Sequence, residues 1–336
     1  MKDASLPPLV SVVIPAYNQS DLLVRALQRL GKQTYGNVEV IISDDNSSID
    51  LRSHVELSNV NPDLLSKIRW FRQEKNLGAY ANAKFCLEIA IGRFLVFLSH
   101  DDWWVSDTFI EDSANTMIAN DRCHVAISNS AIETPNRLDR IMMNLHTNES
   151  GGWKYLNGVE FVNNRLFTDL HPAYSAVLFD LAKLRDLGYE ETWLLPNVYR
   201  PLDIEPDEGF ISLMLTAWSG EVAIRGKVVS VRGTPSDSWS RSIFWEKNVT
   251  FGMFLTYMNF SEFLKKLPDD APYKFVQSLM SSRAYRPRTF RLKFAKYLST
   301  TPAYLVTYIR GILHLGSIKD NMVSHLRKLR TRLRSL

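Results

Sequence analysis

The sequence predicts an α/β protein built on an open, mostly parallel sheet with helices beside it. Short apolar, β-branched runs alternate with segments whose apolar residues recur at helical spacing. Polar residues follow several of these runs at once, as they do at the carboxyl ends of parallel strands. With 336 residues, the chain is long enough for one large domain and an appendage, or for two domains.

The first hundred residues carry the clearest pattern. The run from Val10 to Pro15 is nearly continuous in β-branched residues and stops at a proline, as a buried parallel strand would. Helix caps follow at 18–20, and apolar residues then recur at helical spacing through Leu30. Further strands are predicted at 38–42, 68–71 and 94–98, with a helix at 79–91.

Past residue 102 the pattern is looser. It predicts helices at 103–118 and 210–218, strands at 125–129 and 228–231, and a segment over 175–187 that starts apolar and ends in a helix. The polar, turn-rich segment 134–158 is predicted to be a mobile segment over a site. No strand pattern remains beyond about residue 236, so a helical C-terminal region is expected there.

Composition limits the function classes. No run approaches the roughly 18 to 20 apolar residues of a membrane span, and the first eight residues lack the apolar core of a signal peptide, which favours a cytoplasmic location. Cys86 and Cys123 are too few for a disulfide framework and have no metal-ligand spacing, so both are predicted to be buried thiols.

Two pairs of carboxylates follow predicted strands. Asp101 and Asp102 come directly after the apolar run 94–98, and Asp44 and Asp45 follow the strand 38–42. An unpaired buried carboxylate is costly, so the first pair predicts a site for a cation or a polyhydroxy ligand at the sheet edge. The second pair has an alternative interpretation, an Asx-type turn with Asn46.

Four motifs in one order carry a resemblance to a known family. They are SVVIPAYN at 11–18, VIISDDNSS at 40–48, NLGAYAN at 76–82 and FLSHDDWW at 97–104. Together they resemble the nucleotide-sugar-binding half of family 2 glycosyltransferases, and the likeness extends more weakly to about residue 240. The resemblance implies the GT-A fold, a Rossmann-like mixed, mostly parallel sheet flanked by helices. It implies a domain over 1–235, with a nucleotide-sugar-binding half at 1–104, an acceptor half at 105–235 and a basic helical region at 236–336.

The resemblance also assigns roles within the first half. It places Asp101 at the ribose and Asp102 on a Mg²⁺ or Mn²⁺ that bridges the two phosphates, with both carboxylates as the metal pair. The family commonly has another Asp where Ser99 stands, a departure that lowers the expected metal affinity. His100 is either a further ligand or a partner that orients the carboxylates. The remaining nucleotide-sugar residues are Pro15, Ala16, Tyr17, Asn18, Asp44, Asp45, Asn76, Gly78 and Asn82.

The second half would supply the acceptor side. A carboxylate must take the proton from the acceptor hydroxyl, and Asp207 and Glu208 stand where the family places its acidic pair, although in reversed order. The alternative is that both acids cap a helix beginning near Phe210. Tyr174 and Ser175 lie where the family forms its acceptor pocket.

Basic charge is concentrated in the tail. Residues 281–336 contain 13 Lys and Arg against one acid, so of the net +4 the tail carries +12 and the rest −8. From Ile318 to Leu336 an apolar stripe recurs at steps of three and four, with basic residues on the other faces. Such a helix either lies on a membrane surface with anionic lipid or packs on its own domain or a partner. No RNA-binding motif is present, and no nucleic-acid partner is expected.

Together these features predict an inverting glycosyltransferase. It would move a sugar from a nucleotide-diphosphate donor to a hydroxyl of a glycan or lipid-linked glycan, in surface polysaccharide or O-antigen synthesis. The alternative from another class is a non-catalytic glycan or nucleotide-sugar binder on the same fold. A sugar-phosphate nucleotidyltransferase would need a Gly-rich, Arg-containing loop after the first strand, and residues 15–18 do not provide one.

Overall fold

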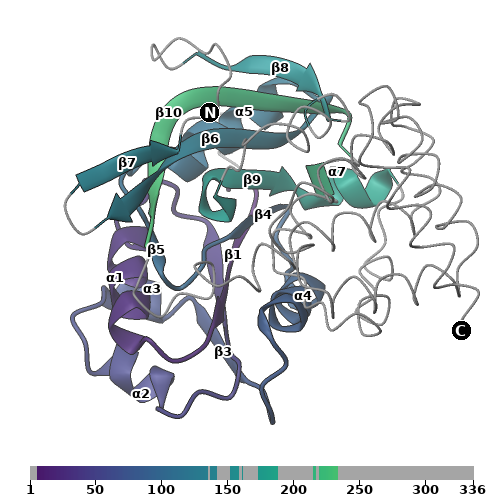
Figure 1. Cartoon of the computed structure of the whole chain (residues 1–336). Helices are drawn as coiled ribbons and strands as arrows, with labels where there is room; N and C mark the ends of the chain where they lie inside the picture. Colours follow the sequence, from purple (N-terminus) through teal and green to yellow (C-terminus); the bar gives the residue numbers. More distant parts are fainter. Residues whose placement is uncertain are drawn as a thin grey trace, which may run out of the picture. The chain divides into compact units, whose positions relative to one another are not determined.

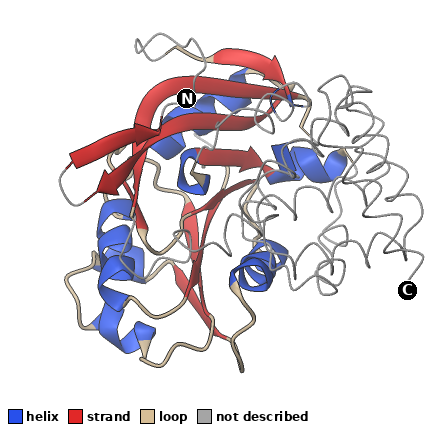
Figure 2. Cartoon of the chain, viewed as in Figure 1, coloured by secondary structure: helices blue, strands red, loops and turns tan. Residues whose placement is uncertain are grey.

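The computed structural model describes residues 6–134, 137–141, 152–158, 161, 173–187, 215–216 and 219–233 (Figures 1 and 2). All of them belong to one of the two compact units into which the chain divides, formed by Met1–Asn197 and Glu205–Arg241. The predicted boundary at residue 235, the helix predicted at 210–218 apart from 215–216, and the basic C-terminal region lie outside the described residues and stay predictions.

The N-terminal half forms four parallel strands in the order β3-β2-β1-β4. They are β1 (Val10–Ala16), β2 (Val38–Asp44), β3 (Ile68–Arg72) and β4 (Phe94–Phe97), as the apolar runs predicted. The helices between them are α1 (Ser20–Leu30), α2 (Leu51–Glu56), α3 (Pro62–Leu65) and α4 (Ala79–Ile89). Because parallel strands all end at the same edge, the loops after β1, β2 and β4 meet there.

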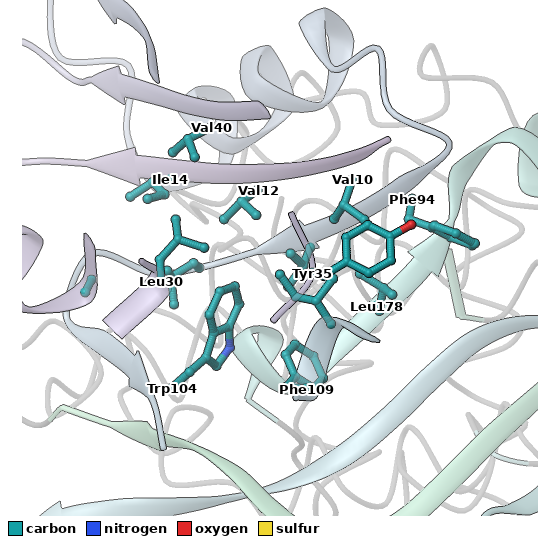
Figure 3. Packing of buried hydrophobic residues seen from close by; sticks show 14 of the residues in the cluster. Val10, Val12, Ile14, Leu30, Tyr35, Val40, Phe94, Trp104, Phe109 and Leu178 are labelled. Carbon is teal, nitrogen blue, oxygen red and sulfur yellow. The ribbon is translucent and has the colours of Figure 1, made fainter. Parts of the chain in front are cut away.

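Helices cover both faces of these strands, which explains why β1 and β4 are apolar without alternation. Val10, Val12 and Ile14 point to one face and pack in a cluster with Leu30 and Phe109 (Figure 3). On the other face α4 lies against β1 and β2. Cys86 of α4 and Cys123 are both buried free thiols, as predicted. Burial raises their pKa values to about 12 and about 11 respectively.

The second half adds mainly antiparallel pairings to the same sheet. The path continues β4-β9-β6-β10-β5; β9 is antiparallel to β4 and β6, and β10 is parallel to β6 but antiparallel to β5. The strands are β5 (Asp102–Trp104), β6 (Cys123–Thr134), β7 (Arg137–Ile141), β8 (Lys154–Asn157), β9 (Val177–Asp180) and β10 (Glu221–Arg232). The helical elements are α5 (Phe109–Ala119), the short 3-10 helix η1 (Tyr174–Ala176) and α7 (Leu181–Asp186). The predicted class, a mixed α/β sheet flanked by helices, is confirmed.

Two predictions in this half are corrected. The helix expected at 103–118 begins only at Phe109, because Trp103 and Trp104 pair with β10 as strand β5. The segment expected to be a polar, mobile stretch over 134–158 contains two strands: β7 pairs with β6, and β8 pairs with β10. Tertiary pairing overrides local pattern in both places.

The strands predicted at 125–129 and 228–231 are each part of a strand of 12 residues, β6 and β10. Buried polar side chains interrupt the apolar runs of both strands and hide their length. Ser128 and Ser130 of β6 and Arg225 of β10 are examples. Within the described ranges, no helix has both the length and the apolar character needed to cross a bilayer.

Glu39 makes a buried polar cluster away from the strand ends that carry the carboxylate pairs. Its carboxylate accepts hydrogen bonds from Ser11 Oγ (2.5 Å), Ile91 N (2.9 Å) and Arg69 Nη1 (2.7 Å). Burial by itself raises the pKa of Glu39, but these donors and the Arg69 charge outweigh it and hold the pKa below the ordinary value of 4.5. The ionised carboxylate is therefore the stabilising form.

Replacing Glu39 by Gln is expected to lower the free energy of unfolding at pH 7 by about 1.5 to 3 kcal/mol, the range for hydrogen bonds to charged groups. Since the folded pKa is depressed, this contribution is present above pH 4.5 and is lost as the pH falls through the folded pKa. Urea unfolding at pH 7 and pH 3 should show the difference from wild type shrinking at the lower pH. Glu56→Gln, at an exposed i,i+4 pair, is the control. An equal difference at both pH values would contradict the assignment.

Candidate functional site at the carboxyl ends of the strands

The loop after β1 is fixed by bonds to the loop after β2. Asn18 N donates to Ser47 Oγ (2.8 Å), and Asn18 Oδ1 accepts from the amide and hydroxyl of Ser48 (3.0 Å each). Asn18 has φ 53° and Gln19 has φ 51°, a left-handed conformation that asparagine tolerates better than most residues. Tyr17 beside them is 46% exposed, whereas Pro15 and Ala16 are buried at the end of β1. A rigid loop thus presents one exposed aromatic ring.

Asp44 is engaged by the protein itself. Its Oδ1 accepts from Ser47 N (2.8 Å), a bond within the turn after β2 that reaches three residues on and not the two of an Asx turn. Its Oδ2 accepts from Arg72 Nη1 (2.9 Å), and Arg72 Nη2 also donates to Ser47 O (2.7 Å). These bonds give Asp44 a clear structural role, and base or ribose recognition by this residue stays a prediction.

Asp45 joins the β2 edge to the loop before α4. Its two carboxylate oxygens accept from Leu77 N (2.6 Å) and Gly78 N (2.9 Å). Burial raises the pKa of Asp45, these donors lower it in part, and the neighbouring Asp44 charge raises it again, so the net shift is upward. Asn76 Oδ1 also accepts from Gly78 N (3.1 Å). Three predicted residues are therefore brought together.

Gly78 is required at its position. It has φ 85° and ψ 159°, a region that essentially only glycine occupies. Asn82, one turn into α4, is buried and bonded to β2: its Nδ2 donates to Ser43 O (2.9 Å) and its Oδ1 accepts from Ser43 Oγ (2.5 Å). Asn82 thus anchors α4 on the sheet, and its predicted contact with a nucleotide stays a prediction.

The turn between β4 and β5 carries the second carboxylate pair. Asp102 N donates to Ser99 O (2.9 Å), closing the turn. Asp101 is half-buried, whereas Asp102 is only 4% exposed and its Oδ2 accepts from Ser175 Oγ (2.7 Å). The two adjacent carboxylates therefore have different surroundings, with Asp101 the more accessible of the two.

His100 faces the β1–α1 loop. Its Nδ1 lies 3.3 Å from Pro15 O and its Nε2 lies 3.2 Å from Gln19 Oε1. Both ring nitrogens are thus within hydrogen-bond distance of protein oxygens. These two contacts tie the β4–β5 turn to the first loop and do not involve a carboxylate, so both roles open to His100, metal ligand and orienting partner, stay predictions.

The predicted acceptor residues lie behind Asp102. Ser175 of η1 is fully buried, and its carbonyl accepts from Trp104 Nε1 (2.5 Å). Tyr174 is half-buried. The acceptor role of both stays a prediction, while Ser175 has a direct contact with Asp102. Asp207 and Glu208 lie outside the described residues.

Gly233 is a site residue that sequence reasoning missed. Its N–H donates to Asp101 O (3.1 Å) at the end of β10, and a Cβ added there would collide with that carbonyl oxygen. Figure 1 shows β10 running to β5, which starts at Asp102. A glycine just after a predicted strand was the available signal, but nothing in the sequence links it to a residue 132 positions earlier.

The donor set suits a hard divalent cation. Among the described residues, no three His, Cys, Asp or Glu side chains gather into a complete metal site. Two carboxylates at a loop match the way Mg²⁺ is commonly held, by one or two carboxylates with phosphate oxygens of a substrate completing the shell. Asp101 and Asp102 are thus of the residue type that holds such a cation, and their role as its ligands stays a prediction.

The fold and this edge define an α/β protein whose polar loops gather at the carboxyl ends of parallel strands, where open α/β sheets generally bind ligands. The family follows from comparison: residues 11–180, from β1 to the end of β9, match the family described as glycosyl transferase family 2. That match covers 170 of the 336 residues. The chain belongs to this family.

Curated relatives match over a shorter stretch. One from Escherichia coli, UDP-Glc:alpha-D-GlcNAc-diphosphoundecaprenol beta-1,3-glucosyltransferase WfgD, is 34% identical over 113 residues. The match covers 33% of this chain and 42% of that relative. The similarity therefore spans well under two thirds of the relative's length.

Solved structures share the fold over a longer stretch. TarS 1–349 of S. aureus has a TM-score of 0.60 at 16% identity, covering 90% of this chain and 82% of that one. The mannosyltransferase PcManGT from Pyrobaculum calidifontis, in complex with GDP-Man and Mn²⁺, has a TM-score of 0.51 at 17% identity, covering 99% and 82%. At this identity the likeness is one of fold, and it agrees with the GT-A expectation.

Proposed function

We propose that this chain is an inverting glycosyltransferase that moves a sugar from a nucleotide-diphosphate donor to an acceptor hydroxyl. The observation that carries the proposal is the meeting of three loops at one sheet edge, within the stretch that matches the family. These are the loop of Tyr17, the loop held by Asp45, and the turn of Asp101 and Asp102.

The donor would lie across these loops. The exposed ring of Tyr17 can stack on a base, and the carboxylates after β2 can accept from a base N–H or a ribose hydroxyl. Asp101 and Asp102 would hold Mg²⁺ or Mn²⁺. That cation would stabilise the charge that develops on the leaving diphosphate.

The acceptor side rests on the sequence and on the relatives. Asp207 or Glu208 would take the proton from the attacking hydroxyl, on the face of the sugar opposite the leaving group. The name of the E. coli relative specifies a lipid-linked sugar acceptor. We extend that acceptor class to this chain, within surface polysaccharide or O-antigen synthesis. The basic amphipathic segment 318–336 would then hold the protein on the cytoplasmic membrane face, through its apolar stripe and through anionic lipid.

A nucleotide panel tests the donor half of this proposal. Thermal unfolding is measured with UDP, GDP, CDP and dTDP, each with and without MnCl₂. A ligand at 100 times its Kd adds about 2.7 kcal/mol to the free energy of unfolding, so one nucleotide with Mn²⁺ should raise Tm by several degrees. The matching nucleotide sugar should then transfer its sugar to a GlcNAc-diphospho-lipid. If no nucleotide stabilises the protein, the donor proposal is wrong and a non-catalytic role is favoured.

A further inference from the structure

Asp102 stands at the end of a chain of buried hydroxyls. Ser175 Oγ is 2.7 Å from Asp102 Oδ2 and 3.2 Å from Ser230 Oγ, which in turn lies 2.8 Å from Ser130 Oγ. The three serines come from η1, β10 and β6, and each is at most 1% exposed. A chain of polar contacts therefore runs from the middle of the sheet to the carboxylate.

The Ser175 hydroxyl is oriented to donate to either of two neighbours, Asp102 Oδ2 and Ser230 Oγ. It has one proton to donate, and the charged carboxylate is both the nearer and the stronger acceptor. The proton therefore goes to Asp102, while Ser130 and Ser230 share a separate hydrogen bond in which either hydroxyl can donate.

Ser175 is itself held in place. Its carbonyl accepts from the indole N–H of Trp104, and the Trp104 side chain is buried in the main core (Figure 3). The backbone of Ser175 is thus tied to a side chain of the core, next to the carboxylate that its hydroxyl contacts.

We propose that Ser175 is a positioning residue for the cation site, an inference that rests on the proposed function. Its hydroxyl helps to fix the orientation of the Asp102 carboxylate relative to Asp101. Without it, this buried carboxylate loses one hydrogen-bond donor. Partners of this kind commonly alter metal affinity when removed, although they touch no metal.

The test compares Ser175→Ala with Ser130→Ala. Both substitutions remove one buried hydroxyl from the same series of hydrogen-bonded serines, but only Ser175→Ala removes a bond to Asp102. Free Mn²⁺ is followed by electron paramagnetic resonance during titration, with the nucleoside diphosphate that stabilises the wild type held at saturation. We expect the Kd for Mn²⁺ to rise about tenfold or more in Ser175→Ala, and to stay within about twofold of wild type in Ser130→Ala.

A kinetic measurement separates positioning from a loss of stability. Transfer by Ser175→Ala should recover toward the wild-type rate as MnCl₂ is raised, whereas a merely structural defect would not respond to the cation. If Ser175→Ala does not fold, Ser175→Cys keeps the volume with a weaker donor and should show an intermediate Kd. Equal Mn²⁺ affinity in wild type and Ser175→Ala or Ser175→Cys would overturn the inference. A wild type that binds no Mn²⁺ with any nucleotide would overturn the proposed cation site as well.

Discussion

Replacing Asp101 by Asn is expected to reduce sugar transfer by about a hundredfold or more. Asp101 is the more accessible carboxylate of the turn, and the Asn side chain keeps its shape while losing the negative charge. A cation at a leaving group is worth several kcal/mol, and each 1.36 kcal/mol is a factor of ten in rate. The measurement is kcat/KM for transfer at saturating MnCl₂, with the Kd for Mn²⁺ determined alongside.

Asp107→Asn is the matched control for this change. Asp107 is exposed in the loop after β5, so the same charge is lost outside the carboxylate pair. Gly233 N bonds the Asp101 carbonyl and not its side chain, so the turn should keep its backbone in Asp101→Asn. Wild-type activity in Asp101→Asn would show that Asp101 is not a ligand of the cation.

Replacing Asp180 by Ala is expected to destabilise the fold by about 3 to 5 kcal/mol, the range for breaking a buried ion pair by removing one partner. The Asp180 side chain is fully buried at the end of β9, and its Oδ2 accepts from Arg93 Nε (3.1 Å) and Nη2 (2.8 Å). Its Oδ1 also caps α7 by accepting from Lys183 N (3.2 Å). Urea unfolding at pH 7 measures the loss.

Asp121→Ala is the control for the buried pair. Asp121 also pairs with a basic side chain, Lys183, but its own side chain is 94% exposed. Exposed pairs contribute little because water and salt screen them. Equal effects of the two variants would show that burial of Asp180 does not determine its contribution.

The sequence allowed prediction of the parallel half of the fold because its signals are local. The strands of β1, β2 and β4 are buried on both faces, so their apolar runs are nearly continuous, and each stops at a polar or proline residue. Asp45, Asn76 and Gly78 could be grouped because loops after neighbouring parallel strands meet by rule.

The rest of the site depends on pairings that a local pattern does not contain. Trp103 and Trp104 fit a helical pattern in the sequence, but in the structure they pair with residues of β10 that lie 128 and 126 positions later. For the same reason the Ser175 contact with Asp102 and the fit of Gly233 against Asp101 had no local signal. Both Ser175 and Gly233 come from the second half of the chain, far in sequence from the residues Asp102 and Asp101 that they contact.

The pairing of β5, from the first half of the domain, with β10, from the second half, determines whether the two halves can be exchanged separately. Strand β5 begins at Asp102, the second carboxylate of the pair, at the end of the donor half. It nevertheless lies at the far end of the sheet, paired with β10, and also packs against α1. A cut after residue 104 therefore severs β5 from the strand that completes it. A chimaera that exchanges donor specificity with another family member would therefore have to exchange β10 and η1 as well. The donor and acceptor halves are regions of sequence, and neither is a structural unit that can be exchanged alone.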